Sequence, residues 1–103
     1  MTDSAELAQW AAIAAEEKKA REVRILDIRS ISVVADYFVI CSGTSGTHVR
    51  AIVDHVEEEL GKKGFTPRHV EGYRGGRWVL LDFGDLVVHV MQEDERSFYN
   101  LER

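Results

Sequence analysis

The feature that most constrains the fold is the stretch from Trp78 to Met91, WVLLDFGDLVVHVM, in which two apolar runs flank a short turn. Gly84 and Asp85 have the residue types of a two-residue β-hairpin turn. In that register the strands pair outward from the turn until Trp78 lies opposite Met91. The stretch therefore predicts a β-hairpin, and with it a fold built around a sheet.

Side chains alternate between the two faces of such a hairpin. One face carries only apolar side chains and is expected to face the core: Val79, Leu81, Phe83, Leu86, Val88 and Val90. The other, which we name the outer face, mixes apolar and polar side chains: Trp78, Leu80, Asp82, Val87, His89 and Met91. Slipping the register by one residue would exchange the two faces.

Two interpretations of the outer face stay open at this point. The N- or C-terminal helix covers it, or it is an exposed patch kept for a protein partner, because Trp and Met are enriched at interfaces. In the second case Trp78 and Met91 are apolar anchors. Asp82 then meets a Lys or Arg of the partner, and His89 forms hydrogen bonds at the rim.

The rest of the chain alternates helical and strand patterns. We expect a helix over Asp3–Ala20, strands over Val23–Ile28 and Asp36–Gly43, a second helix over 44–64, a loop or edge strand over 71–77 and a helix over 93–103. The second helix begins at Thr44 or Ser45 and ends at Gly61 or Gly64. This order predicts an α/β fold, a mixed sheet with flanking helices.

Composition limits the classes of function. The 103 residues suggest one domain over 1–103, with an N-terminal helix over 1–20. A single Cys allows no internal disulfide, and neither a secretion signal nor a membrane-spanning run is present, so we expect a cytoplasmic protein without membrane contact. The net charge of -5 disfavours nucleic acid as the main contact and suits a basic protein partner.

Candidate catalytic and metal-binding groups are sparse. His48 and His55 lie two helical turns apart, and no zinc motif is present, so we predict no metal and no cofactor. Cys41 is expected to be a buried thiol, with a nucleophilic pair to His48 or His89 as the alternative.

The turn over 41–48, CSGTSGTH, joins a strand to a helix. It is either a simple helix cap or a phosphate-binding turn, although it lacks the Lys-Ser/Thr ending of a Walker A motif. Nucleotidyl transfer would also need an acidic pair on the next strand to hold metal ions. Asp82 and Asp85 flank a turn and do not form such a pair, so we predict a protein that is not an enzyme.

Taken together, DYFVICSGTS, HV, AIVDHVEEEL, VEG, WVLLDFGDLVVHVM and FYNLE resemble the Iojap family, also called ribosomal silencing factors or RsfS. The resemblance covers about Val23 to the end, residues 23–103. It departs from the family at Thr47, where many members have a basic residue before the following His.

The resemblance implies a fold similar to that of nucleotidyltransferases without their catalytic acidic residues, and a homodimer in solution. It also implies binding to ribosomal protein L-fourteen on the large ribosomal subunit, which blocks joining of the small subunit and represses translation. Two other functions remain as alternatives: a small nucleotide-handling enzyme using the 41–48 turn and Asp82, and a dimeric adaptor with another protein partner.

Overall fold

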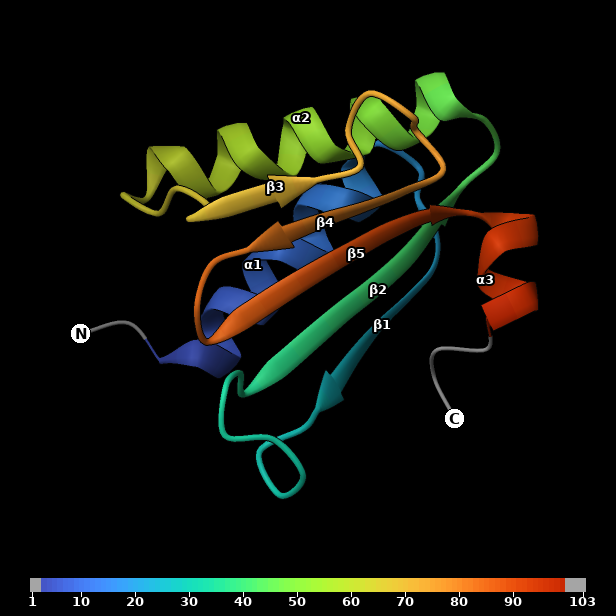
Figure 1. The fold of residues 1–103 in the computed structure, drawn as a ribbon. Coiled ribbons are helices and arrows are strands. Elements are labelled where there is room, and N and C mark those ends of the chain that lie inside the picture. The colour runs from blue at the N-terminus through green and yellow to red at the C-terminus, as the bar shows by residue number, and fades with distance from the viewer. Residues whose placement is uncertain (1–2, 100–103) are drawn as a thin grey trace.

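The computed structural model describes residues 3–99, and in this range five strands form one sheet with helices packed against it (Figure 1). The elements are α1 (Ser4–Glu17), β1 (Arg21–Asp27), β2 (Tyr37–Gly43), α2 (Gly46–Lys62), β3 (His69–Glu71), β4 (Trp78–Asp82), β5 (Leu86–Gln92) and α3 (Glu93–Tyr99). The sheet order is β1-β2-β5-β4-β3. Only β2 and β5 are parallel among these neighbours. The predicted mixed α/β sheet with flanking helices is confirmed, and β3 is its short edge strand.

The N-terminal helix is shorter than the sequence pattern predicts. Asp3 caps it, accepting a hydrogen bond from the Ala5 amide at 3.0 Å. The helix ends at Glu17 because Lys19 takes a positive φ of 61° and the Ala20 amide bonds back to the Ala15 carbonyl at 3.1 Å. Lys18, Lys19 and Ala20 are all good helix formers, so propensity alone places the end too late.

The structure settles both open ends of α2. Ser45 is the N-cap, and its hydroxyl accepts a hydrogen bond from the His48 amide at 3.1 Å. Gly64, with φ of 91°, is the residue that stops the helix, since glycine adopts this left-handed conformation without a steric cost. The Phe65 amide then bonds to the Leu60 carbonyl at 3.0 Å, which closes the last turn.

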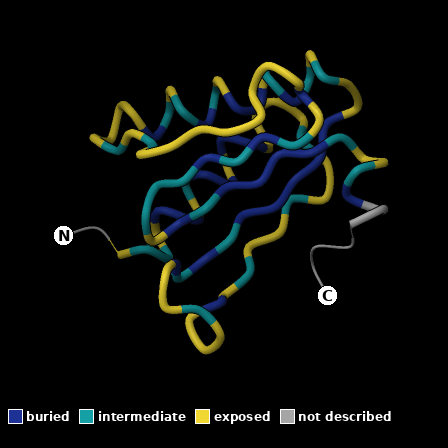
Figure 2. The backbone as a smooth tube through the Cα atoms, in the orientation of Figure 1, coloured by how far each residue is buried: buried dark blue, intermediate teal, exposed yellow. Residues whose placement is uncertain are grey.

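The helices are divided between the two faces of the sheet (Figure 1). α1 and α2 pack side by side on one face, where their buried residues join those of the strands in one core. The central strands are mostly buried and the edges are exposed (Figure 2). α3 lies on the opposite face at one end, where Arg96 Nη1 donates to Ser42 Oγ at 2.9 Å. Within residues 3–99, the helix cover over the second face is therefore limited to one end.

The predicted hairpin register is confirmed. Trp78 pairs with Met91, and the ladder continues inward to Asp82 and Val87. The Phe83 amide donates to the Leu86 carbonyl at 2.8 Å across the turn. Gly84 has a φ of 95°, which explains why a glycine stands there. Five residues of the predicted core face are completely buried: Val79, Leu81, Leu86, Val88 and Val90. Phe83, next to the turn, is only partly buried.

No helix in the described range 3–99 is both long enough and apolar enough to cross a lipid bilayer.

Candidate functional site

The outer face of the hairpin is closed at the end where α3 packs. Met91 and its β2 neighbour Ser42 are both fully buried there. Arg96 of α3 reaches across to Ser42 and is itself 5% exposed. The expectation that Met91 is an exposed apolar anchor is therefore wrong in this structure, because the chain turns after Gln92 and lays α3 over this end of the sheet. The interpretation that a terminal helix covers the outer face is therefore correct for this end of it, where α3 is the covering helix.

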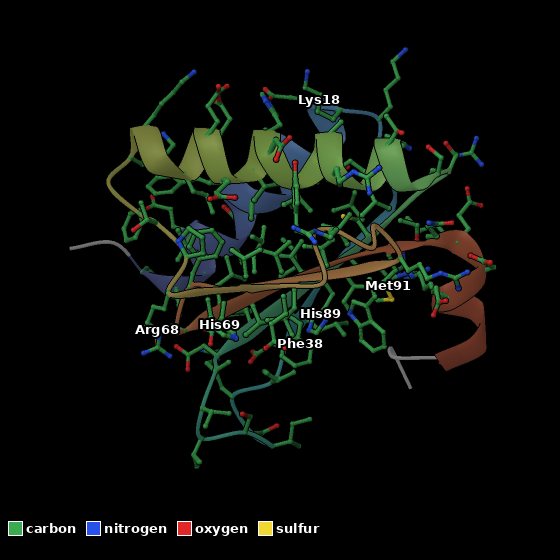
Figure 3. All side chains as sticks on the ribbon, turned by 45° about the horizontal axis from the view of Figure 1, so that its top comes forward. Lys18, Phe38, Arg68, His69, His89 and Met91 are labelled. Carbon is green, nitrogen blue, oxygen red and sulfur yellow. The ribbon has the colours of Figure 1, made fainter. Side chains whose placement is uncertain are left out.

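The other end of the outer face is open and forms a groove of about 520 Å³, which we call the outer groove. Its apolar lining comes from the loop between β1 and β2 and from three strands: Ile28, Ile31, Val34, Ala35, Phe38, Leu80 and Val87. The rest of its lining is Gly84 and six polar residues: Ser32, Arg68, His69, Glu71, Asp82 and His89. Figure 3 shows Phe38 and His89 on the side of the sheet opposite α2, with Arg68 and His69 toward one end.

Four of the six predicted site residues line the outer groove, namely Leu80, Asp82, Val87 and His89. Trp78 is partly exposed and lies outside the lining, although it hydrogen-bonds to a lining residue. The structure thus brings most of the predicted patch together and separates Met91 from it.

Charged pairs stand at the edge of the groove. Asp82 Oδ1 accepts a hydrogen bond from the Gly84 amide at 2.8 Å and lies 3.7 Å from Arg68 Nη2. His69 Nε2 lies 2.9 Å from Glu71 Oε2. The Asp82 carboxylate therefore already has partners within the chain, and an additional Lys or Arg from a protein partner stays a prediction.

His89 is buried in the wall of the groove, with 5% of its surface exposed, so it lies deeper than the rim at which we expected it. A hydrogen bond from His89 to a partner stays a prediction. Its Nδ1 accepts a hydrogen bond from Trp78 Nε1 at 3.1 Å, and its ring centroid is 4.7 Å from that of Phe38. Burial lowers the pKa of His89 to about 4, which keeps the ring neutral at pH 7.

The Trp78 contact also decides where the hydrogen of the neutral His89 ring lies. An indole nitrogen can only donate, so His89 Nδ1 must be the acceptor and Nε2 must carry the hydrogen. Within the described residues, this Nε2 is buried and has no hydrogen-bond partner. The groove wall therefore contains an unused donor.

The loop between β1 and β2 contributes exposed apolar residues that the sequence reasoning missed. Ile31, Val33 and Val34 have relative exposures of 83%, 104% and 80%. Ile31 and Val34 also line the outer groove, so groove and loop form a continuous apolar surface. The available signal was the apolar run ISVVA, which falls between two predicted strands and so belongs to a loop.

The alternative catalytic pairs are not assembled. Cys41 faces the helical core, and burial raises the pKa of its thiol to about 12. His89 faces the other side of the sheet, as the β2–β5 register requires. The His48 ring is occupied by backbone groups, with Nδ1 accepting from the Thr44 amide at 2.9 Å and Nε2 2.8 Å from the Lys18 carbonyl oxygen. Cys41 thus has no base positioned to activate it among the described side chains.

The phosphate and metal alternatives find little support in the geometry. Ser45 Oγ and the His48 ring already engage amides of the 41–48 turn, as in an ordinary helix cap. Among the described residues, one group has metal-ligand geometry, His55, Glu58 and Glu59 on α2. Within it, His55 pairs with Glu17 at 2.7 Å and Glu59 with Lys62 at 2.8 Å, so these two side chains serve surface ion pairs.

Comparison with known proteins gives the context of this site. The family profile described as "Ribosomal silencing factor during starvation", RsfS, matches residues 1–103. A ribosomal silencing factor RsfS of Bacillus subtilis is 46% identical over 93 residues, which cover 90% of this chain and 79% of the relative. A chloroplastic Iojap protein of Zea mays is 36% identical over 103 residues, covering 97% of this chain and 45% of that protein.

A solved structure agrees with the sequence relatives. The crystal structure of a Chromobacterium violaceum protein superposes with a TM-score of 0.95 at 31% sequence identity, covering 98% of this chain and 84% of the other. The family profile covers the whole sequence, and the relative from Bacillus subtilis is 46% identical. The chain therefore belongs to the RsfS family of ribosomal silencing factors.

Proposed function

We propose that the chain silences ribosomes by binding ribosomal protein L-fourteen on the large subunit through the outer groove and the adjoining loop. The bound chain then blocks the joining of the small subunit and represses translation. This is a binding function without catalysis. The surface comprises Leu80, Asp82, Val87 and the loop over 31–34, with Trp78 beside it and His89 in its wall; Met91 supports it from within.

The observation that carries this proposal is the open end of the outer face. α1 and α2 cover the opposite face, and α3 covers the end at Met91. What remains is an apolar groove of about 520 Å³ with exposed Ile31, Val33 and Val34 beside it. Such a continuous apolar surface on a small chain is typical of a protein-binding site.

Charge and size are consistent with this partner. The net charge of -5 favours encounter with a basic protein, and most ribosomal proteins are basic. A steric block needs a stable contact and no turnover, and a standard interface of about 1,600 Å² is enough for such a contact. We further propose that the chain acts in the cytoplasm and is a homodimer when it is not bound to the ribosome.

The test is a subunit-joining assay with Leu80→Lys. Leu80 is partly exposed in the groove, so the fold should tolerate the new side chain while its charge repels a basic partner. We expect unmodified protein to keep purified ribosomal subunits apart in sedimentation, and the variant to let them join.

The matched control is Ala51→Lys, which adds the same charge at an exposed position of α2, on the other face of the sheet. It should inhibit joining as the unmodified chain does. Equal inhibition by Leu80→Lys and the unmodified chain would exclude the outer groove as the contact surface.

A further inference from the structure

We infer that the outer groove receives an apolar loop of the large-subunit partner that presents a neutral carbonyl oxygen, and that His89 Nε2–H is the donor that recognises this oxygen. The inference rests on the proposed function and assigns one hydrogen bond within that contact.

His89 carries an unused hydrogen-bond donor. The Trp78 indole fixes the hydrogen of His89 on Nε2, and this nitrogen is buried without a partner among the described residues. A buried donor without an acceptor lowers the stability of the fold, and such donors are rare in folded proteins. The groove that His89 lines is the place from which an acceptor can arrive.

The residues around His89 determine which kind of acceptor suits its donor. The lining around His89 is apolar, with Phe38, Leu80 and Val87 as neighbours in the groove. A carboxylate would lose its hydration there without a cation to offset the loss, whereas an amide carbonyl loses far less. The cation at the groove edge, Arg68, is already near Asp82. The site therefore favours a main-chain carbonyl, or an Asn or Gln side chain, over an acidic group.

An acceptor reaches His89 through the outer groove, next to Phe38. Phe38 is partly exposed, lines the groove and packs against the His89 ring with the ring planes 63° apart (Figure 3). A rotamer change of Phe38 would make room for the occupant beside the His89 ring, and one such change costs less than a hydrogen bond made in a dry site returns. The occupant then lies beside the His89 ring in the place that Phe38 takes here.

The experiment measures the affinity of three proteins for purified large ribosomal subunits by co-sedimentation: the unmodified chain, His89→Phe and His89→Gln. Phe keeps the ring shape and removes both the Nε2 donor and the Nδ1 acceptor of the Trp78 indole, whereas the Gln amide nitrogen can occupy the place of Nε2. We expect His89→Phe to bind about tenfold more weakly and His89→Gln to recover most of that loss. Circular dichroism and urea unfolding check that both variants fold.

The outcomes separate this inference from the proposed function. If the unmodified chain binds and His89→Phe binds equally well, no hydrogen bond is made at Nε2 and only the present inference fails. If both folded variants lose affinity equally, shape and not the donor matters, and the inference also fails. If the unmodified chain itself does not bind large subunits, both the proposed function and this inference are wrong.

Discussion

The two faces of the β4–β5 hairpin show how one short sequence serves two purposes. On the core face, Leu81 and Val88 pair across the strands, and both are fully buried against the helices. On the outer face, Leu80 pairs with His89, and here one side chain is partly exposed while the other is buried. On the core face every fully buried side chain packs against the helices. On the outer face, the exposure of each side chain depends on which other segments of the chain cover it.

That difference explains which residues can change without loss of the fold. A core-face side chain contacts other elements all around, so its removal leaves a cavity. A groove-lining side chain already borders open space, so its removal costs little stability but changes the surface offered to a partner. Variants that separate stability from binding therefore test the assignment of the two faces directly.

The largest expected effect is on the core face. Leu81→Ala should lower the free energy of unfolding by about 3 kcal/mol, since it removes a fully buried side chain from a packed core. Leu80→Ala, the matched change on the adjacent residue, should cost less than about 1 kcal/mol because Leu80 lines the open groove. Urea unfolding followed by circular dichroism measures both. Equal losses for the two variants would contradict the assignment of faces.

A smaller effect concerns the buried His89. Its pKa of about 4 in the fold lies below the ordinary 6.5, so the unfolded chain binds a proton more readily than the folded chain. His89 therefore contributes a loss of stability as the pH falls from about 6.5 toward 4, and no further change below that. The loss should amount to about 2–3 kcal/mol.

The comparison variant is His89→Gln, which removes the titrating ring and keeps a polar side chain. Urea unfolding between pH 7 and pH 4 should show a shallower fall for this variant than for the unmodified chain. Parallel pH curves for the two proteins would mean that His89 titrates alike in the folded and unfolded states, against the burial that the structure gives it.

The sequence predicted the hairpin well because alternation and turn chemistry are local properties. The register, the core face and the turn at Gly84–Asp85 follow from residues within fourteen positions of one another. The burial of Met91 and His89, in contrast, depends on segments outside the hairpin. Met91 is buried at the end of the sheet where Arg96 of α3 reaches its neighbour Ser42, and His89 packs against Phe38 from a strand that is distant in the sequence.

The outer groove was beyond sequence reasoning for the same physical reason. Its walls come from the β1–β2 loop, from β3 and from the hairpin, which only the sheet order β1-β2-β5-β4-β3 brings together. The parallel pairing of β2 with β5 places Phe38 next to Val87 and inserts the loop beside the hairpin. A single sequence contains no local signal for that long-range pairing, so only four of the fourteen residues that line the groove were predicted.

The smallest expected effect on stability comes from the β1–β2 loop, and it sharpens the contrast between folding and binding. Val33 is 104% exposed, so Val33→Ser should change the free energy of unfolding by less than about 0.5 kcal/mol. If the loop contacts the ribosome, the same variant should bind large subunits roughly three- to tenfold more weakly, because an apolar contact in the interface is lost. Ile13→Ser is the matched control, since Ile13 is 55% exposed on α1, which packs on the opposite face of the sheet. Co-sedimentation should show unchanged affinity for that control. Undiminished affinity of Val33→Ser would confine the contact to the groove itself and remove the loop from the proposed surface.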